Sequence, residues 1–266
     1  MRRRLAAIDF ETKPIGSRPD YPPEPVGVAL RYGGRSEYLA WGHPTANNCT
    51  KAEAVKKTRG ILAEFTPIFH NADFDLEVME RAFHLRPKGE YHCTMRAAFI
   101  NEPRSVDLGL KPQAAKFLGM PADEQTMLRR WIIENVPEAR KKAKKSKATG
   151  ELALSTWGDY ICRTPGKLCG IYAKGDVDRT LPLHEYCAKE RAKCDAKYDE
   201  SRMEEAYQLE MALIPIKLDM EQRGIRLRTT KLKKEISGYD KLFHDLDRRI
   251  RKRLKVGDDF NVGSGQ

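Results

Sequence analysis

The chain has 266 residues, of which 40% are hydrophobic and 33% charged, so it can bury the core of one large domain beneath a strongly charged surface. Its net charge of +11 favours a polyanionic partner, although basic charge alone does not establish nucleic-acid binding. No run of about 18 apolar residues is present, which excludes a membrane-spanning helix of the usual length. Asp9 and Glu11 interrupt the first apolar run, which excludes a signal-peptide core there and predicts a cytoplasmic protein.

Apolar periodicity predicts strands early in the chain and helices later. Strands are expected at 5–8, 26–32, 36–41, 67–69 and 225–227. Helices are expected at 51–65, 73–84, over most of 92–136, with interruptions from 155 to 223, and at 230–254. Gly33-Gly34 separates two of the strands and is typical of a hairpin turn. The order of elements predicts an α/β fold in which helices cover a mixed sheet, and the change in composition predicts a domain boundary near residue 200.

The segment 137–150 carries six basic residues, one acidic residue and no large apolar side chain. This composition predicts a flexible basic loop that contacts nucleic acid, with a solvated charged surface as the alternative. The basic helix expected at 230–254 leaves the same two alternatives open.

The six cysteines form no C-x-x-C pair, but Cys162/Cys169 and Cys187/Cys194 each share one helical face through a seven-residue step. A zinc site that includes His184 is one interpretation of this spacing. Reduced, partly buried thiols of a cytoplasmic protein are the other, and the sequence favours them.

Two acidic residues stand at the end of the first predicted strand. Asp9 and Glu11 lie two positions apart, and on an extended chain such residues point to the same face. Paired carboxylate oxygens are ligands that Mg²⁺ prefers, so this pair is a candidate metal site. A solvated strand end is the alternative.

Further acidic residues occupy predicted helices. Asp75 lies in the first turn of a helix, where Asp73 is the better candidate for the N-cap. Tyr172 and Asp176 are four residues apart, so on a helix the hydroxyl and the carboxylate project from one side. Asp178 is expected to face away from them.

Three short motifs occur in a fixed order: Asp9-Phe10-Glu11-Thr12, Asn71-Ala72-Asp73-Phe74-Asp75 and Tyr172-Ala173-Lys174-Gly175-Asp176. Together they resemble the proofreading 3'→5' exonuclease domain of family A DNA polymerases, especially those of phages. The wider group is the DEDD exonucleases on the ribonuclease H-like fold, and the tyrosine marks the DEDDy branch. Gly175 departs from a regular helix interior, since glycine costs about 1 kcal/mol there relative to alanine, and this predicts a bent or loosened helix.

The resemblance continues toward the end of the chain. Residues 210–225 look like the segment that joins exonuclease to polymerase, and 261–266 look like the start of a thumb-region motif. The resemblance implies an exonuclease domain at 1–199 and, at 200–266, a C-terminal helical appendage that resembles the start of a polymerase domain. The chain stops where a polymerase active site would follow, which leaves a polymerase domain on a separate chain as a candidate partner.

The resemblance also implies a chemistry and roles for single residues. Asp9, Glu11, Asp75 and Asp176 would hold two divalent ions, Mg²⁺ or Mn²⁺, and Tyr172 would orient the attacking water. The substrate would be a single-stranded DNA 3' end in a bacterial or phage-infected cell, and the products nucleoside 5'-monophosphates. The terminal nucleotide would contact Thr12, Asn71 and Phe74. For Phe74, packing in the core is the alternative.

Two other functions fit part of the pattern. An RNA exonuclease resembling ribonuclease D would share the four carboxylates and the tyrosine, but the polymerase-like stretch at 200–227 argues against it. A catalytically inactive exonuclease domain kept as a DNA-binding scaffold is the non-enzymatic alternative. The complete set of metal ligands argues against the scaffold.

Overall fold

The computed structural model describes residues 4–146, 150, 152–199, 201–257 and 260–261. The chain divides into two compact units, one ending at Leu218 and the other beginning at Asp219. Each unit is described by itself.

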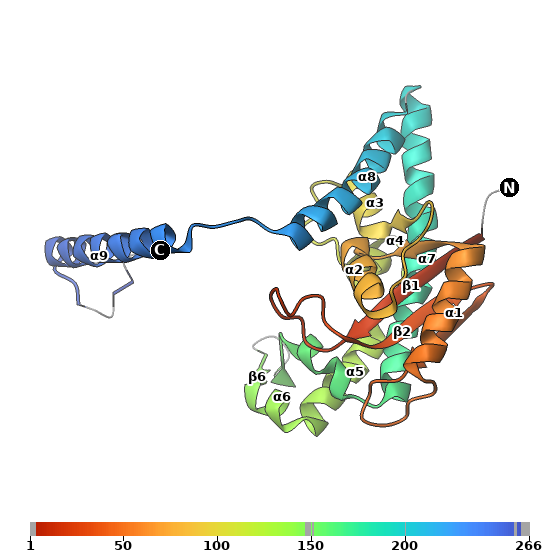
Figure 1. Ribbon diagram of the computed structural model, residues 1–266, viewed down its shortest axis with the longest axis horizontal. Helices are drawn as coiled ribbons and strands as arrows, with labels where there is room; N and C mark the ends of the chain where they lie inside the picture. Colours follow the sequence, from red (N-terminus) through yellow and green to blue (C-terminus); the bar gives the residue numbers. More distant parts are fainter. Residues whose placement is uncertain (1–3, 147–149, 151, 200, 258–259, 262–266) are drawn as a thin grey trace. The chain divides into compact units, whose positions relative to one another are not determined.

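The first unit is built on a five-stranded mixed sheet with the strand order β3-β2-β1-β4-β5 (Figure 1). Its strands are β1 (Arg4–Thr12), β2 (Pro25–Tyr32), β3 (Arg35–Ala40), β4 (Phe65–Phe69) and β5 (His92–Cys93). β1 lies at the centre, antiparallel to β2 and parallel to β4. The hairpin expected at Gly33-Gly34 joins β2 to β3, and both glycines have positive φ, +55° and +79°, as a tight two-residue hairpin turn requires.

Helices cover both faces of this sheet (Figure 1). The helices of the first unit are α1 (Lys51–Glu64), α2 (Ala72–Phe83), α3 (Thr94–Asn101), α4 (Leu110–Leu118), α5 (Asp123–Asn135), α6 (Pro137–Lys142), the 3₁₀ helix η1 (Trp157–Arg163), α7 (Gly166–Tyr198) and α8 (Arg202–Arg223), which extends past Leu218. One core joins Ile8, Phe10 and Leu30 to α1, α2, α3 and α8. A second core joins Ala7 and Ala29, on the opposite face, to α5 and α7.

Small residues on the second face allow α7 to pack closely on the sheet. A Cβ added to Gly27 would lie 1.9 Å from the hydroxyl oxygen of Tyr38. A Cβ added to Gly170, on α7, would lie 3.0 Å from the Tyr38 ring. The Tyr38 ring therefore occupies the space that side chains at these two positions would need. This packing brings α7 over β1, where the candidate site lies.

Helix α8 packs on the first unit through a row of apolar residues. Tyr207, Met211, Ile214 and Leu218 are buried in the core that contains Ile8 and Phe10. Residues 202–218 therefore pack with the part of the chain that precedes residue 200. The division into an exonuclease domain at 1–199 and a polymerase-like segment at 200–266 stays a prediction.

Two local predictions were wrong. The basic segment 137–150 is not a loop throughout, because Val136 and Ala139 are buried against Leu128 and α6 forms there, followed by β6 (Lys144–Lys145), which pairs with β7 (Leu152–Ala153). Residues 147–149 lie outside the described residues. The strand expected at 225–227 is absent, since those residues have no strand partner among the described residues and Ile225 is 89% exposed.

The second unit contains α9 (Thr229–Leu254), a helix with no buried residue. Apart from Asn261, the motif expected at 261–266 lies outside the described residues. Across the part of the chain that the structure describes, the helices are too short or too polar to cross a membrane.

Candidate metal centre

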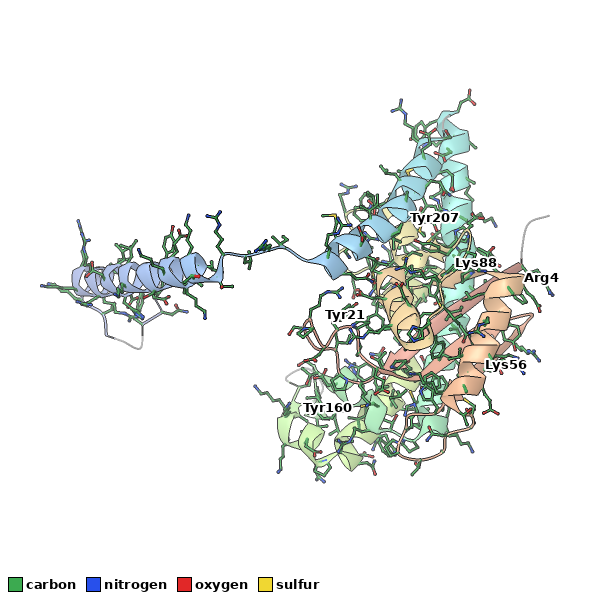
Figure 2. All side chains as sticks on the ribbon, viewed as in Figure 1. Arg4, Tyr21, Lys56, Lys88, Tyr160 and Tyr207 are labelled. Carbon is green, nitrogen blue, oxygen red and sulfur yellow. The ribbon has the colours of Figure 1, made fainter. Side chains whose placement is uncertain are left out.

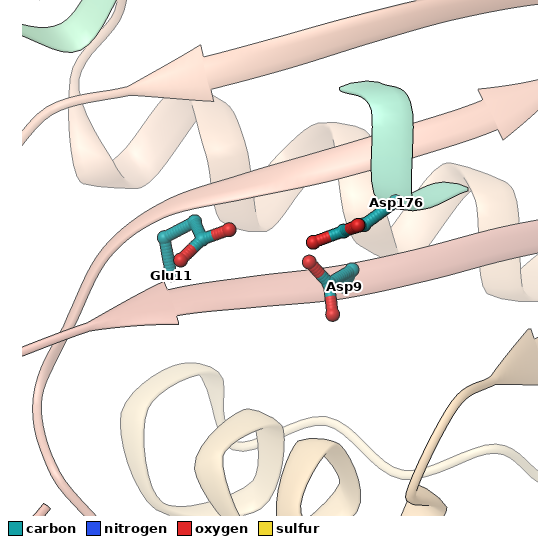
Figure 3. Close-up of side chains that lie close together, drawn as sticks. All are labelled: Asp9, Glu11 and Asp176. Carbon is teal, nitrogen blue, oxygen red and sulfur yellow. The ribbon is translucent and has the colours of Figure 1, made fainter. Parts of the chain in front are cut away.

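Three carboxylates from two elements converge on one point. Asp9, Glu11 and Asp176 each offer an oxygen, and these three oxygens lie within 4.8 Å of one another (Figure 3). Glu11 and Asp176 are buried, and Asp9 keeps part of its surface accessible. The sequence spacing placed Asp9 and Glu11 on one face, and the fold adds Asp176 from α7.

The register of the sheet explains why the carboxylates face α7. Asp9 lies opposite Ala29, and Glu11 lies opposite Gly27 on β2. Because Ala29 is small, no side chain of β2 covers Asp9, and Asp176 approaches from α7. At Gly27 the missing side chain leaves room for the Tyr38 hydroxyl.

Helix α7 is continuous through Gly175, so the glycine does not interrupt it. An added Cβ at Gly175 would lie 2.8 Å from Nη1 of Arg179 and 2.9 Å from Oε1 of Glu124. These two groups form a buried ion pair at 2.6 Å that ties α5 to α7. Residue 175 is therefore a glycine because the Arg179–Glu124 ion pair leaves no room for a side chain there. Tyr172 and Asp176 keep their spacing of one helical turn.

Asp75 reaches the centre from α2, on the other side of β1. Its Oδ1 accepts a hydrogen bond of 3.1 Å from the backbone N–H of Phe10, and the side chain is buried. Asp75 is not part of the three-carboxylate group, but it lies near enough to Asp9 for the negative charge of Asp9 to raise the pKa of Asp75. The structure thus places Asp75 beside the group, with one oxygen held by the backbone.

Two neighbouring acids have other partners. Asp73 is not the N-cap of α2, because Asn71 occupies that position and makes no side-chain cap. Asp73 instead forms ion pairs with Arg96 at 3.2 Å and Lys217 at 3.0 Å. Asp178 faces away from the centre as expected, and it binds Arg31 and Ser36.

Burial and mutual repulsion oppose ionisation of the four acids. Desolvation, followed by the charge of Asp176, raises the pKa of Asp9 to about 7. Desolvation is also the main cause that raises the pKa of Glu11 and Asp75, and the charge of Asp9 adds to it in both. Asp176 has a raised pKa from burial, which Lys111 partly offsets. The centre therefore needs additional positive charge to hold all four groups ionised.

Lys111, on α4, is a member of the centre that the sequence did not reveal. Its Nζ donates to both carboxylate oxygens of Asp176, at 2.6 Å for Oδ2, and to the Tyr172 hydroxyl at 3.1 Å. It also lies 4.2 Å from the centroid of the Tyr172 ring. No short-range pattern indicates such a role, because the partners lie 61 and 65 positions away along the chain.

The structure also places the residues expected to hold the terminal nucleotide. Thr12 is buried at the end of β1, and its hydroxyl donates to the carbonyl of Lys13. Asn71 has a left-handed backbone at the start of α2, which the asparagine side chain tolerates. Phe74 is half-buried against the core, with its ring centroid 6.3 Å from that of Tyr21. A role of these three residues in binding a nucleotide stays a prediction.

The donor set suits a hard divalent cation. All three converging donors are carboxylate oxygens, which Mg²⁺ and Mn²⁺ prefer, and bound cations would compensate the unfavourable charge of the buried acids. The cysteines and His184 form no comparable cluster among the described residues, and all six thiols are free. The zinc alternative thus gains no support from the fold.

We expect the metal-free protein to lose stability as pH rises from about 4 to about 7. The usual pKa of an aspartate is about 3.9, and that of Asp9 in the folded protein is about 7. Between these values the folded state binds more protons than the unfolded state, so the free energy of unfolding falls as pH rises. Urea unfolding in EDTA at pH 5 and pH 8 measures the effect. Asp9→Asn cannot ionise and should show a smaller fall; a variant that falls as steeply as the wild type would contradict the assignment.

Residues 5–191 match the DNA polymerase A exonuclease family, described as 3'-5' exonuclease. No match to a curated protein sequence was found.

Among solved structures, the polymerase domain of Pol1 from M. smegmatis in complex with DNA primer-template and dNTP is similar with a TM-score of 0.59 and 13% identity, over 97% of this chain and 35% of that one. Brucella melitensis NrnC with bound Mg²⁺ is similar with a TM-score of 0.51 and 18% identity, over 84% and 87% of the two chains. Escherichia coli RNase D, an exoribonuclease, has a TM-score of 0.48 and 17% identity over 82% and 46%. The likenesses to Pol1 and NrnC bear on the fold, which is the expected ribonuclease H-like arrangement of a mixed sheet flanked by helices.

Proposed function

Because the chain belongs to the family of 3'-5' exonuclease domains, we propose that it hydrolyses phosphodiester bonds at the 3' end of single-stranded DNA with the help of two divalent ions, Mg²⁺ or Mn²⁺. The products would be nucleoside 5'-monophosphates. The observation that carries the proposal is the convergence of Asp9, Glu11 and Asp176 on one point, with Asp75 beside them.

The ligands divide by position. Asp9, Glu11 and Asp176 would hold one ion, and Asp9 together with Asp75 would hold the second. The chemistry that two such cations supply when bound is activation of a water molecule and stabilisation of the departing 3'-oxygen. The geometry here gives each acid a fixed backbone position on β1, α2 or α7.

Tyr172 is suited to orient water rather than to remove its proton. Burial, and then the charge of Asp176, raise the pKa of the Tyr172 hydroxyl well above its usual value. The hydroxyl therefore stays protonated at neutral pH and remains a hydrogen-bond donor and acceptor. Thr12, Asn71 and Phe74 would hold the terminal nucleotide at the same edge of the sheet.

A basic hollow near the end of β1 supports a nucleic-acid strand as the substrate. A cavity of about 660 Å³ is lined by Lys13, Lys142, Arg163, Tyr160 and Asp159, among others (Figure 2 labels Tyr160). Lys13 follows the catalytic motif directly, and Lys142 comes from the basic segment that was expected to contact DNA. Cations beside an aromatic ring are a common arrangement for binding single strands.

RNA is the alternative substrate, since the carboxylates and the tyrosine are also expected of a ribonuclease D-like enzyme. We favour DNA because residues 210–225 resemble the segment that joins exonuclease to polymerase. The same resemblance supports a proofreading role in DNA replication, with a polymerase domain as the partner.

Digestion of matched 5'-labelled DNA and RNA single strands tests the function. With Mg²⁺ or Mn²⁺ we expect a ladder of shortened DNA products, and no ladder in EDTA. Faster digestion of RNA would support the ribonuclease alternative. If neither strand is shortened, a Mn²⁺ titration decides between a metal-binding enzyme that needs its partner and an inactive scaffold, because a scaffold should bind no Mn²⁺ at Asp9 and Asp176.

A further inference from the structure

The ammonium group of Lys111 is hydrogen-bonded to the carboxylate of Asp176. Both carboxylate oxygens accept from its Nζ, and the Tyr172 hydroxyl is a third partner. The lysine side chain is only 15% exposed, and that of Asp176 only 7%. The ammonium is therefore held within the centre and not on its rim.

A second cation near Asp176 is fixed in a different way. Nη1 of Arg179 lies 3.9 Å from Oδ1 of Asp176, but the guanidinium binds both oxygens of Glu124 and the carbonyl of Pro121. Arg179 is committed to these partners and is 4% exposed. Among the described residues, the hydrogen bonds of the Lys111 ammonium, by contrast, go to Asp176 and Tyr172. Its flexible four-carbon stem lets the ammonium move by rotation about single bonds.

We propose that Lys111 is the internal counter-cation of the metal-free centre: it competes with a divalent cation for Asp176 and, once displaced, binds the phosphodiester of the nucleic-acid strand. The competition follows from the contacts, since the ammonium occupies one side of both oxygens of Asp176 and its positive charge repels a divalent cation at the same carboxylate. The second half follows from charge, because a displaced ammonium beside a cation site needs another anion. This inference rests on the proposed function for the identity of that anion, a backbone phosphate.

The first test is Mn²⁺ binding to Lys111→Met without nucleic acid, followed by calorimetry. Removal of a neighbouring charge changes the affinity of a carboxylate for a proton by about one to three pKa units, and we expect Mn²⁺ to bind about tenfold or more tightly. In EDTA the variant should melt at a lower temperature than the wild type, and Mn²⁺ should remove the difference. Equal or weaker Mn²⁺ binding by the variant would overturn the competition.

Two matched variants separate charge from structure. Lys116→Met lies on the same helix, where the lysine pairs with exposed Glu102 at 2.6 Å, and it should leave Mn²⁺ affinity and melting temperature unchanged. Lys111→Arg keeps the positive charge and should restore the melting temperature in EDTA. A fall equal to that of Lys111→Met would show that the shape of the lysine matters rather than its charge, and would overturn the proposal.

Kinetics on a labelled DNA strand tests the transfer to phosphate. Loss of one charged hydrogen bond is expected to raise KM of Lys111→Met about tenfold or more. A lower kcat with an unchanged KM would overturn the phosphate contact while leaving the competition intact. If the wild type cleaves no nucleic acid but Lys111→Met binds Mn²⁺ more tightly, the proposed function fails and the competition at Asp176 stands.

Discussion

Replacing Asp9 by alanine is expected to abolish the ladder of 3'-shortened products. Asp9 lies in the centre of the sheet, contributes to the three-oxygen group and is electrostatically linked to both Asp75 and Asp176. It is thus the one acid that would serve both metal ions. Removal of a single strong electrostatic group from an active site commonly costs about 10²–10³ in rate, and loss of a shared ligand should cost at least this much. Single-turnover digestion in Mg²⁺ or Mn²⁺ measures the effect.

Asp178→Asn is the matched control for this loss. Asp178 lies on the same helix as Asp176, but its carboxylate binds Arg31 and Ser36 outside the centre. Its rate should stay within a few-fold of that of the wild type. Asp9→Ala should also melt at least as high as the wild type in EDTA at pH 8, because it removes one of several repelling charges. An active Asp9→Ala protein would contradict the assignment of the centre.

Replacing Tyr207 by alanine is expected to destabilise the first unit by about 3–5 kcal/mol, the usual cost of truncating a buried aromatic side chain. Tyr207 is 1% exposed on α8 (Figure 2). The Arg191 guanidinium lies 3.9 Å from its ring centroid, and its hydroxyl lies 3.2 Å from Nδ1 of His92. The variant loses these contacts and leaves a cavity against the core. Urea unfolding followed by circular dichroism measures the change.

The exposed tyrosine of α9 provides the comparison. Tyr239 is 70% exposed, so Tyr239→Ala should alter the free energy of unfolding by no more than about 0.5 kcal/mol. Equal, small effects of the two variants would show that α8 does not support the first unit. A large effect of Tyr207→Ala alone would mean that a fragment ending at residue 199 lacks part of the core.

We also expect the amide hydrogens of the two units to exchange at different rates. Residues 202–218 should be protected like the sheet, since Met211, Ile214 and Leu218 are buried with it. Helix α9 has no buried residue and should exchange faster. The sequence by itself placed both segments in one appendage, because the composition changes near residue 200 and because residues 210–225 and 261–266 resemble polymerase segments.

Short-range periodicity determined the parts of this protein that depend on neighbours in the chain. The alternation of a strand put Asp9 and Glu11 on one face, and the helical turn put Tyr172 above Asp176. Positive φ at Gly33 and Gly34 follows from the local demands of a tight hairpin. In each case the interacting groups lie within a few residues of each other, so the spacing carries the information.

The tertiary structure alone decided which distant groups meet. Lys111 joins the centre from α4, and Asp73 pairs with Arg96 and Lys217 instead of capping α2. Tyr207 attaches α8 to the sheet by contacting His92, which lies more than a hundred positions earlier in the chain. No periodicity encodes such contacts, because they are selected by the shape and charge of surfaces that exist only once the sheet and its helices have assembled.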